Sequence, residues 1–292
     1  MNSAYRGVFV PMITPFTPAG AIDEPAIGRI VNHLVAGGVN VFPLGTTGES
    51  ASIASDDKRR VVEAVVKHAS GRATVYAGIA GTCFRESVEL AKAFEQLGGN
   101  GRSGVAAVVA HPPSYYPLGD DEIESYFLRL ADTVPLPLVL YNIPATTHHS
   151  IALDVVDRLR RHPNIVAIKD SSGDRPRLSE MLKRTGGRDG DFPVLLGSSA
   201  SFSHGLRAGA VGLVPSGGHL VPREYQAMYE AAMAKRWDEV ERLQHETDAV
   251  CAQYLKGRSL AQGLSALKAV MEQRGLCGRT MLPPLKDHVG TV

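Results

Sequence analysis

The chain has 292 residues, of which 44% are apolar and 21% charged, and its 31 Lys and Arg residues against 30 Asp and Glu leave a formal net charge of +1. These values exclude a disordered chain, which would be poorer in apolar residues or far from charge balance. The near-neutral charge also argues against a nucleic-acid partner. Residues 1–16 lack a charged start followed by a long apolar core, and no later segment approaches the ~20 apolar residues that span a bilayer. We therefore expect a cytoplasmic protein with no membrane partner.

The cysteines and histidines do not form a metal-binding pattern. Cys83, Cys251 and Cys277 lie far apart without C-x-x-C spacing or a nearby histidine, which indicates neither a zinc site nor a disulfide framework. The only close histidine pair is His148-His149, and adjacent residues of an extended segment point in opposite directions. We expect no bound metal.

The predicted elements alternate between short apolar runs and amphipathic helices, beginning with an apolar run over 7–14. Asp23 is a plausible cap for the first helix, with Pro25 close to its start. Apolar residues over 27–35 then recur at the spacing that places one stripe against a core. Gly37 ends this helix, because glycine accepts the conformation that a C-terminal cap needs.

Further apolar runs, separated by helical stretches, follow at 39–44, 74–80, 105–110, 137–142, 165–170, 193–198 and 211–216. They are continuously apolar rather than alternating, as strands covered on both faces should be. Repeated β/α units of this kind predict a TIM (β/α)8 barrel in the α/β class. A doubly wound open sheet is the structural alternative.

The strand pattern ends at Pro222. Beyond it the sequence predicts three helices, over 223–237, 238–256 and 260–275. We assign 1–221 to a barrel catalytic domain and 222–292 to a C-terminal helical segment packed on the barrel. The glycine-rich connector 98–104 is interpreted as a surface loop.

Lys169 is the most informative single residue, because it ends a run, 165–168, that should be buried. Desolvation lowers the pKa of a lysine by disfavouring its charged form. A neutral amine is a nucleophile towards ketones, so this placement suits Schiff-base chemistry. The alternative is a lysine that only tips the strand, and reaches solvent or pairs with Asp170.

The turn Gly45-Thr46-Thr47-Gly48-Glu49 follows the second strand. Its glycines allow a tight turn that exposes backbone N–H groups, and the hydroxyls of Thr46 and Thr47 can hold a carboxylate and pass a proton. A plain strand-to-helix turn is the alternative. Tyr141 closes the fifth run, close enough in a barrel for its phenol to reach the same centre, although a buried tyrosine can also serve packing alone.

The strand-end motifs together resemble the dihydrodipicolinate synthase and N-acetylneuraminate lyase family, the pyruvate-type class I aldolases. The likeness covers nearly the whole chain and rests on VPMITPFTPAGAID (10–23), GTTGES (45–50), PPSYYP (112–117), YNIP (141–144) and IKDSSGD (168–174). The resemblance implies a TIM barrel with C-terminal helices, a homotetramer, a small 2-oxo acid substrate, and no metal or organic cofactor.

The resemblance also implies roles for individual residues. Lys169 would form the Schiff base and Tyr141 would transfer protons. Thr46 and Thr47 would bind the keto-acid carboxylate and relay protons, and Tyr116 would reach into the site of a neighbouring subunit. We expect the remaining substrate-binding positions at Gly48, Ser171, Gly197, Val214 and Ser216.

Two departures from the family pattern bear on the substrate. The synthase branch resembles YNVPSRTG at the fifth strand, with an arginine that grips a second carboxylate, whereas this chain has Thr146 there. A hydroxyl cannot replace a bidentate guanidinium at equal strength. Gly197 is followed by Ser198 and Ser199, where sialic-acid lyases carry an acidic pair. Both departures argue against those two activities.

The sequence therefore predicts a Schiff-base lyase that cleaves, condenses or dehydrates pyruvate or a hydroxylated 2-oxo acid. His148 and Ser171 could supply distal hydrogen bonds to such a substrate, although His148 could also be a plain loop residue. The alternatives are 4-hydroxy-tetrahydrodipicolinate synthase itself and a family member without turnover that acts as a binding protein. A metal-dependent aldolase or hydrolase would need a cluster of ligands at the strand ends, which the sequence does not provide.

Overall fold

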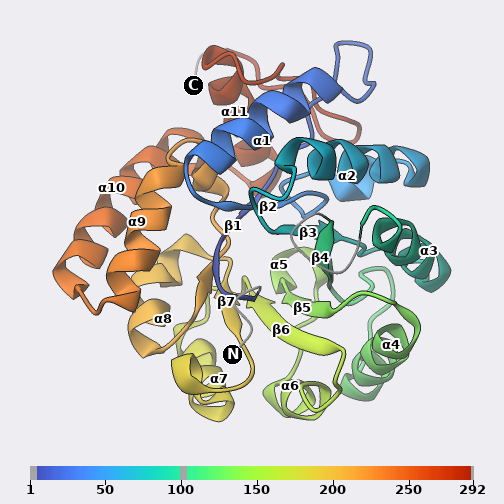
Figure 1. Ribbon diagram of the computed structural model, residues 1–292, viewed down its shortest axis with the longest axis vertical. Helices are drawn as coiled ribbons and strands as arrows, with labels where there is room; N and C mark the ends of the chain where they lie inside the picture. The colour runs from blue at the N-terminus through green and yellow to red at the C-terminus, as the bar shows by residue number, and fades with distance from the viewer. Residues whose placement is uncertain (1–4, 99–103, 291–292) are drawn as a thin grey trace.

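The computed structural model describes residues 5–98 and 104–290. Parallel strands close into a barrel in which each strand pairs with its neighbours in chain order and β8 pairs with β1 (Figure 1). The strands are β1 Gly7–Pro11, β2 Asn40–Phe42, β3 Val75–Gly78, β4 Val105–Ala110, β5 Leu138–Asn142, β6 Ile165–Asp170, β7 Val194–Leu196 and β8 Gly212–Leu213. The closed topology confirms the predicted TIM barrel and excludes the open doubly wound sheet, which would have two edge strands.

Helices surround the barrel in a ring (Figure 1). They are α1 Glu24–Ala36, α2 Ser55–Ala69, α3 Phe84–Glu95, α4 Asp120–Thr133, α5 Pro144–Thr147, α6 Leu153–Leu159, α7 Arg175–Thr185 and α8 Phe202–Ala208. One helix follows each of β1 to β4, β6 and β7, and two helices, α5 and α6, follow β5. The predicted cap of α1 is present, since the carboxylate of Asp23 accepts a hydrogen bond from the N–H of Ala26 at 3.0 Å. The alternation of covered strands and amphipathic helices in the sequence is thus the alternation of the fold.

The strands β1 to β7 bury side chains on both faces. One set packs between the strands and the helices, and includes Val8 and Val10 of β1. A smaller set fills the barrel interior, where the rings of Phe9 and Tyr76 stack at 4.0 Å between centroids. Because side chains alternate along a strand, Lys169 shares the interior face of β6 with Ala167.

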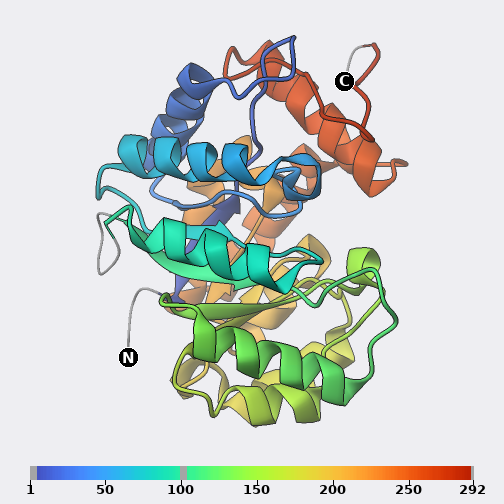
Figure 2. The ribbon, with the colours of Figure 1, turned by 90° about the vertical axis from the view of Figure 1, so that its right-hand side faces the viewer.

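The helices after the barrel begin at the predicted position. They are α9 Pro222–Met233, α10 Trp237–Leu255 and α11 Leu260–Gln273. α9 and α10 lie side by side next to α8, and α11 lies by α1 at the same end of the molecule as the carboxyl terminus (Figures 1 and 2). A capping box starts α11, in which Ser259 accepts from the N–H of Gln262 and the Gln262 side chain accepts from the N–H of Ser259.

Three strands span half or less of their predicted runs: β2 against 39–44, β7 against 193–198 and β8 against 211–216. β8 ends at Leu213 because Pro215 has no N–H for a strand ladder, and Ser216–His219 then coil into a 3-10 turn. Residues 99–103, which form most of the glycine-rich connector, lie outside the described residues. Over the two described ranges, no helix combines the length and apolar character needed to cross a membrane.

Candidate active site

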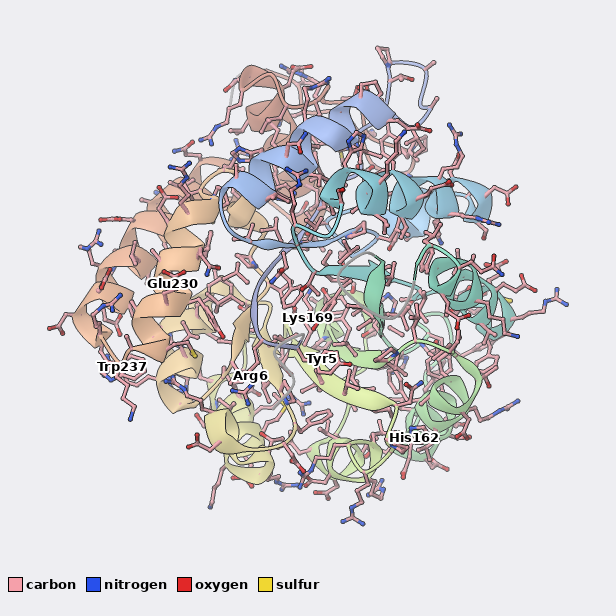
Figure 3. All side chains as sticks on the ribbon, viewed as in Figure 1. Tyr5, Arg6, His162, Lys169, Glu230 and Trp237 are labelled. Carbon is pink, nitrogen blue, oxygen red and sulfur yellow. The ribbon has the colours of Figure 1, made fainter. Side chains whose placement is uncertain are left out.

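A cavity of about 310 Å³ opens at the carboxyl ends of the strands and gathers most of the predicted residues. Its lining includes Thr46, Thr47, Tyr141, Lys169, Ser171, Gly197, Val214 and Ser216. Hollows of about 490 and 500 Å³ lie elsewhere on the described surface, but neither is lined by a predicted site residue. In Figure 3 the label of Lys169 lies near the middle of the ring of strands, whereas His162 and Trp237 lie at the periphery.

Lys169 is held beside Tyr141 by the pairing of β5 with β6, which places the two residues opposite each other in register. The Lys169 side chain is buried, and its Nζ lies 3.9 Å from the centre of the Tyr141 ring and 5.0 Å from that of Phe42. Burial lowers the pKa of the Lys169 ammonium, and the Tyr141 phenol partly opposes this effect. The amine is therefore poised to lose its proton more readily than an ordinary lysine.

The carboxylate of Asp170, the next residue, is engaged elsewhere. It accepts hydrogen bonds from Nδ2 of Asn142 at 2.8 Å and from the backbone N–H of Ser172 at 3.0 Å. It also pairs with Nε of Arg177 at 3.3 Å. Within the described parts of the chain, no carboxylate lies within ion-pairing distance of Lys169, so the alternative of a Lys169–Asp170 pair is not what the structure shows.

The hydroxyl of Thr46 meets the phenol of Tyr141. The two oxygens lie 3.4 Å apart, and either group can donate. This contact is long for an O–H···O hydrogen bond, as catalytic contacts often are before substrate binds. Lys169, Tyr141 and Thr46 thus form a contiguous amine, phenol and alcohol, which is a set that can transfer protons at a carbonyl centre.

Gly197 provides room beside the amine. A Cβ at this position would collide with Oγ of Ser171 and lie 3.0 Å from Cε of Lys169. Its backbone N–H donates to the carbonyl oxygen of Asp170 at 2.7 Å, which ties the start of the loop after β7 to β6. A glycine here therefore keeps the lysine free to move towards a substrate.

Three predicted residues lie outside this cavity lining. Gly48 is a buried residue of the turn, and its carbonyl oxygen accepts a hydrogen bond from Oγ1 of Thr14 at 2.7 Å. Tyr116 is 68% exposed and stacks edge-on against Tyr115. His148 is exposed as the left-handed C-terminal cap of α5, with φ of 62°. The substrate-binding roles of these residues and the intersubunit role of Tyr116 remain predictions.

The C-terminal helices contribute a wall of the cavity that the sequence analysis did not anticipate. Tyr225 of α9, Cys251 and Leu255 of α10, and Leu260 of α11 all line it. Leu255 and Leu260 are partly exposed, at 37% and 48%, which is unusual for leucines in this chain. Both lie in predicted helices, but no local signal distinguishes an apolar residue at the mouth of a site from one in the core.

His111 also lies near the site, and the sequence analysis assigned it no role. Its ring is half-buried and lies edge-on to the Tyr141 ring at 6.1 Å. Burial lowers the pKa of His111, and the neighbouring charge of Lys169 lowers it further. Across residues 5–98 and 104–290, no three His, Cys, Asp or Glu side chains gather in a way that could hold a metal ion.

A closed (β/α)8 barrel with a buried lysine beside a tyrosine at the carboxyl ends of its strands is the arrangement of a barrel enzyme that forms a Schiff base with a carbonyl substrate. The family described as the dihydrodipicolinate synthetase family matches residues 4–289, so the chain belongs to that family. It is a lyase of the class I aldolase type, as its relatives are. The predicted family and reaction class are confirmed.

Individual relatives support the assignment over most of the chain. The 4-hydroxy-tetrahydrodipicolinate synthase of Acidothermus cellulolyticus is 33% identical over 281 residues, which cover 96% of this chain and 86% of the relative. The enzyme of the same name from Phenylobacterium zucineum is 35% identical over 243 residues, covering 81% and 78%. The solved dihydrodipicolinate synthase of Bacteroides thetaiotaomicron superimposes with a TM-score of 0.90 at 30% identity, over 99% of this chain and 95% of that one.

Proposed function

We propose that this chain is a cytoplasmic class I lyase that binds a 2-oxo acid, such as pyruvate or a hydroxylated 2-oxo acid, as an imine on Lys169. The observation that carries the proposal is a buried lysine with no carboxylate at ion-pairing distance among the described residues, packed against the ring of Tyr141. No metal or organic cofactor enters the proposed reaction, because the imine itself withdraws electrons from the substrate.

The reaction begins when the neutral amine of Lys169 attacks the C2 carbonyl, and water leaves to give a protonated imine. A proton then leaves C3, or the C4 hydroxyl gives up its proton as the bond from C3 to C4 breaks and an aldehyde is released. In both cases the electron pair is held as an enamine. After cleavage the enamine takes up a proton at C3, whereas in dehydration it expels the C4 hydroxyl as water, and hydrolysis of the imine then frees the product. Tyr141 and Thr46 move these protons, since their hydroxyls are adjacent and the amine lies over the Tyr141 ring. Thr47 holds the carboxylate, which fixes the substrate for attack.

The cavity favours a substrate whose far end is uncharged over one that carries a second carboxylate. Lys169 is the one charged side chain among its described lining residues. Thr146, at the position of the arginine in the synthase branch, donates its hydroxyl to the carbonyl of Ile143. The names of the relatives favour a second candidate, 4-hydroxy-tetrahydrodipicolinate synthase, which must accept a carboxylate-bearing aldehyde. We propose a homotetramer for either activity, in line with the exposed Tyr115-Tyr116 pair.

A panel of hydroxylated 2-oxo acids tests the proposal. Release of pyruvate marks aldol cleavage, whereas loss of water with the carbon chain intact marks dehydration. We expect turnover of at least one such substrate by the wild-type chain and none by Lys169→Ala. Turnover only with pyruvate and a carboxylate-bearing aldehyde would identify the synthase instead, and equal turnover by Lys169→Ala would contradict both candidates.

A further inference from the structure

Glu49, the last residue of the GTTGE turn, has no part in the reaction proposed above. Its carboxylate faces away from the cavity and is buried, while the hydroxyl of Thr46 faces Tyr141 from the other end of the same turn. Glu49 also adopts a left-handed backbone conformation, with φ of 57°, which an ordinary side chain rarely does. A carboxylate buried inside the protein needs a partner of opposite charge or hydrogen-bond donors.

The partner is Lys268 of α11, which forms a buried ion pair with Oε1 of Glu49. The other carboxylate oxygen, Oε2, accepts a hydrogen bond from the backbone N–H of Leu282 at 3.0 Å. Nζ of Lys268 also donates to the carbonyl oxygen of Thr280 at 2.8 Å and lies 4.2 Å from the centre of the Phe16 ring. The turn, the helix α11 and the tail after it are therefore joined at one point.

The turn is built so that movement at Glu49 reaches Thr46. The backbone N–H of Glu49 donates to the carbonyl oxygen of Thr46 at 3.1 Å. A second hydrogen bond, from the N–H of Gly48 to the carbonyl oxygen of Gly45 at 3.0 Å, closes the first half of the turn. Gly48 packs so tightly that a Cβ there would lie 2.8 Å from the carbonyl oxygen of Met12. The backbone between Thr46 and Glu49 therefore has little room to deform.

A buried ion pair adds little to folding when compared with apolar residues of the same volume, because desolvation offsets its attraction. Its geometry is specific, however, and such pairs can fix one arrangement of the chain. Here the arrangement that is fixed is the approach of Thr46 to Tyr141, whose hydroxyl oxygens already lie 3.4 Å apart, so a retreat of the turn would break their contact.

We propose that Glu49 and Lys268 are positioning residues for the reaction, whose buried ion pair holds the Thr46-Thr47 turn against Tyr141 and so makes proton transfer depend on the C-terminal helix α11. This inference rests on the proposed function, because it assigns the pair a role through the proton-transferring hydroxyls. The C-terminal segment then positions the turn through Lys268, in addition to lining the mouth of the cavity.

The test separates imine formation from the later proton transfers. The variant Glu49→Gln/Lys268→Met removes both charges at similar volume and leaves an oxygen to accept from Leu282. We expect it to fold, to be trapped by borohydride at saturating pyruvate as fully as the wild type, and to lose roughly 10- to 100-fold in kcat. The matched control is Glu272→Gln, which breaks the pair between α11 and Arg279 of the tail without touching the turn, and should keep both readouts.

A folded double variant with the kcat of the wild type would overturn the inference. So would a double variant whose borohydride trapping falls as much as its turnover, because that result indicates a purely structural role for the ion pair. Should the double variant fail to fold, the same two readouts are taken on Glu49→Gln alone, and the same outcomes decide. Absence of a trapped adduct in the wild type would overturn the proposed function, and this inference with it. A trapped wild type with an unimpaired variant overturns the inference alone.

Discussion

The chain contains two buried lysines in opposite situations. Lys169 and Lys268 expose 4% and 1% of their surfaces, each lies over an aromatic ring, and burial lowers the pKa of both. Lys268 has the carboxylate of Glu49 as a partner, whereas no carboxylate within the described ranges pairs with Lys169. The difference shows how one residue type serves as a charged structural contact where it is paired and as a nucleophile where it is not.

Replacing each lysine by methionine should have the largest effect on activity, and the loss of kcat should be much greater at position 169 than at position 268. Lys169→Met removes the nucleophile, and we expect kcat to fall by about 10³-fold or more, as when a covalent catalyst is deleted. Lys268→Met leaves the amine in place and should retain imine formation. Steady-state turnover of both variants checks this, and comparable activity in Lys169→Met and wild type would contradict the distinction.

The effect on stability should run in the reverse order. Lys268→Met leaves the Glu49 carboxylate buried without its counter-charge, which costs about 3–5 kcal/mol. Lys169→Met removes an unpaired buried amine and adds apolar contact with the rings of Phe42 and Tyr141, so we expect a gain of roughly 0.5–2 kcal/mol. Urea unfolding followed by circular dichroism measures both, and a stabilised Lys268→Met would refute the structural role of the ion pair.

The variant Tyr141→Phe tests how the phenol acts on the unpaired Lys169. The phenol transfers protons and also raises the pKa of Lys169, against the larger lowering by burial. We expect kcat to fall by roughly 10²- to 10⁴-fold, the usual contribution of a general acid or base. Borohydride trapping at high pH should survive, because the ring still packs on the amine. Complete loss of trapping would show that Tyr141 is needed for imine formation itself.

The smallest expected effect is a shift in pH dependence. The amine reacts only when neutral, so the trapping rate should rise with pH through the pKa of Lys169 and level off above it. That midpoint should lie below the ordinary lysine value of about 10.4, because burial lowers this pKa. In Tyr141→Phe it should lie lower still, since the group that raises it is gone. A midpoint at or above the ordinary value would contradict the dry environment of the amine.

Most of the barrel could be predicted from the sequence, because covered strands leave continuous apolar runs, whereas amphipathic helices leave apolar residues at a helical spacing. Lys169, Tyr141 and Thr46 could be placed together because the carboxyl ends of parallel strands meet at one edge of the barrel. The prediction of β8 as a longer strand was wrong at its end, where Pro215 interrupts the ladder.

The contacts that cross between distant segments could not be predicted. Leu255 and Leu260 look like ordinary apolar positions of a helical stripe, and only tertiary packing brings them to the cavity. Lys268 and Glu49 lie far apart in the sequence, and an isolated lysine in a helix gives no sign that it is buried. Pairing between the barrel and the C-terminal helices depends on the assembled fold rather than on local pattern.

Peptide mapping after borohydride reduction with pyruvate tests the central claim most directly, because it offers both buried lysines to the same trap. The account predicts one added pyruvate-derived mass per chain, on the peptide that contains Lys169, with the peptide of Lys268 unmodified. An adduct on any other lysine, or no adduct under conditions where the enzyme turns over, would contradict it.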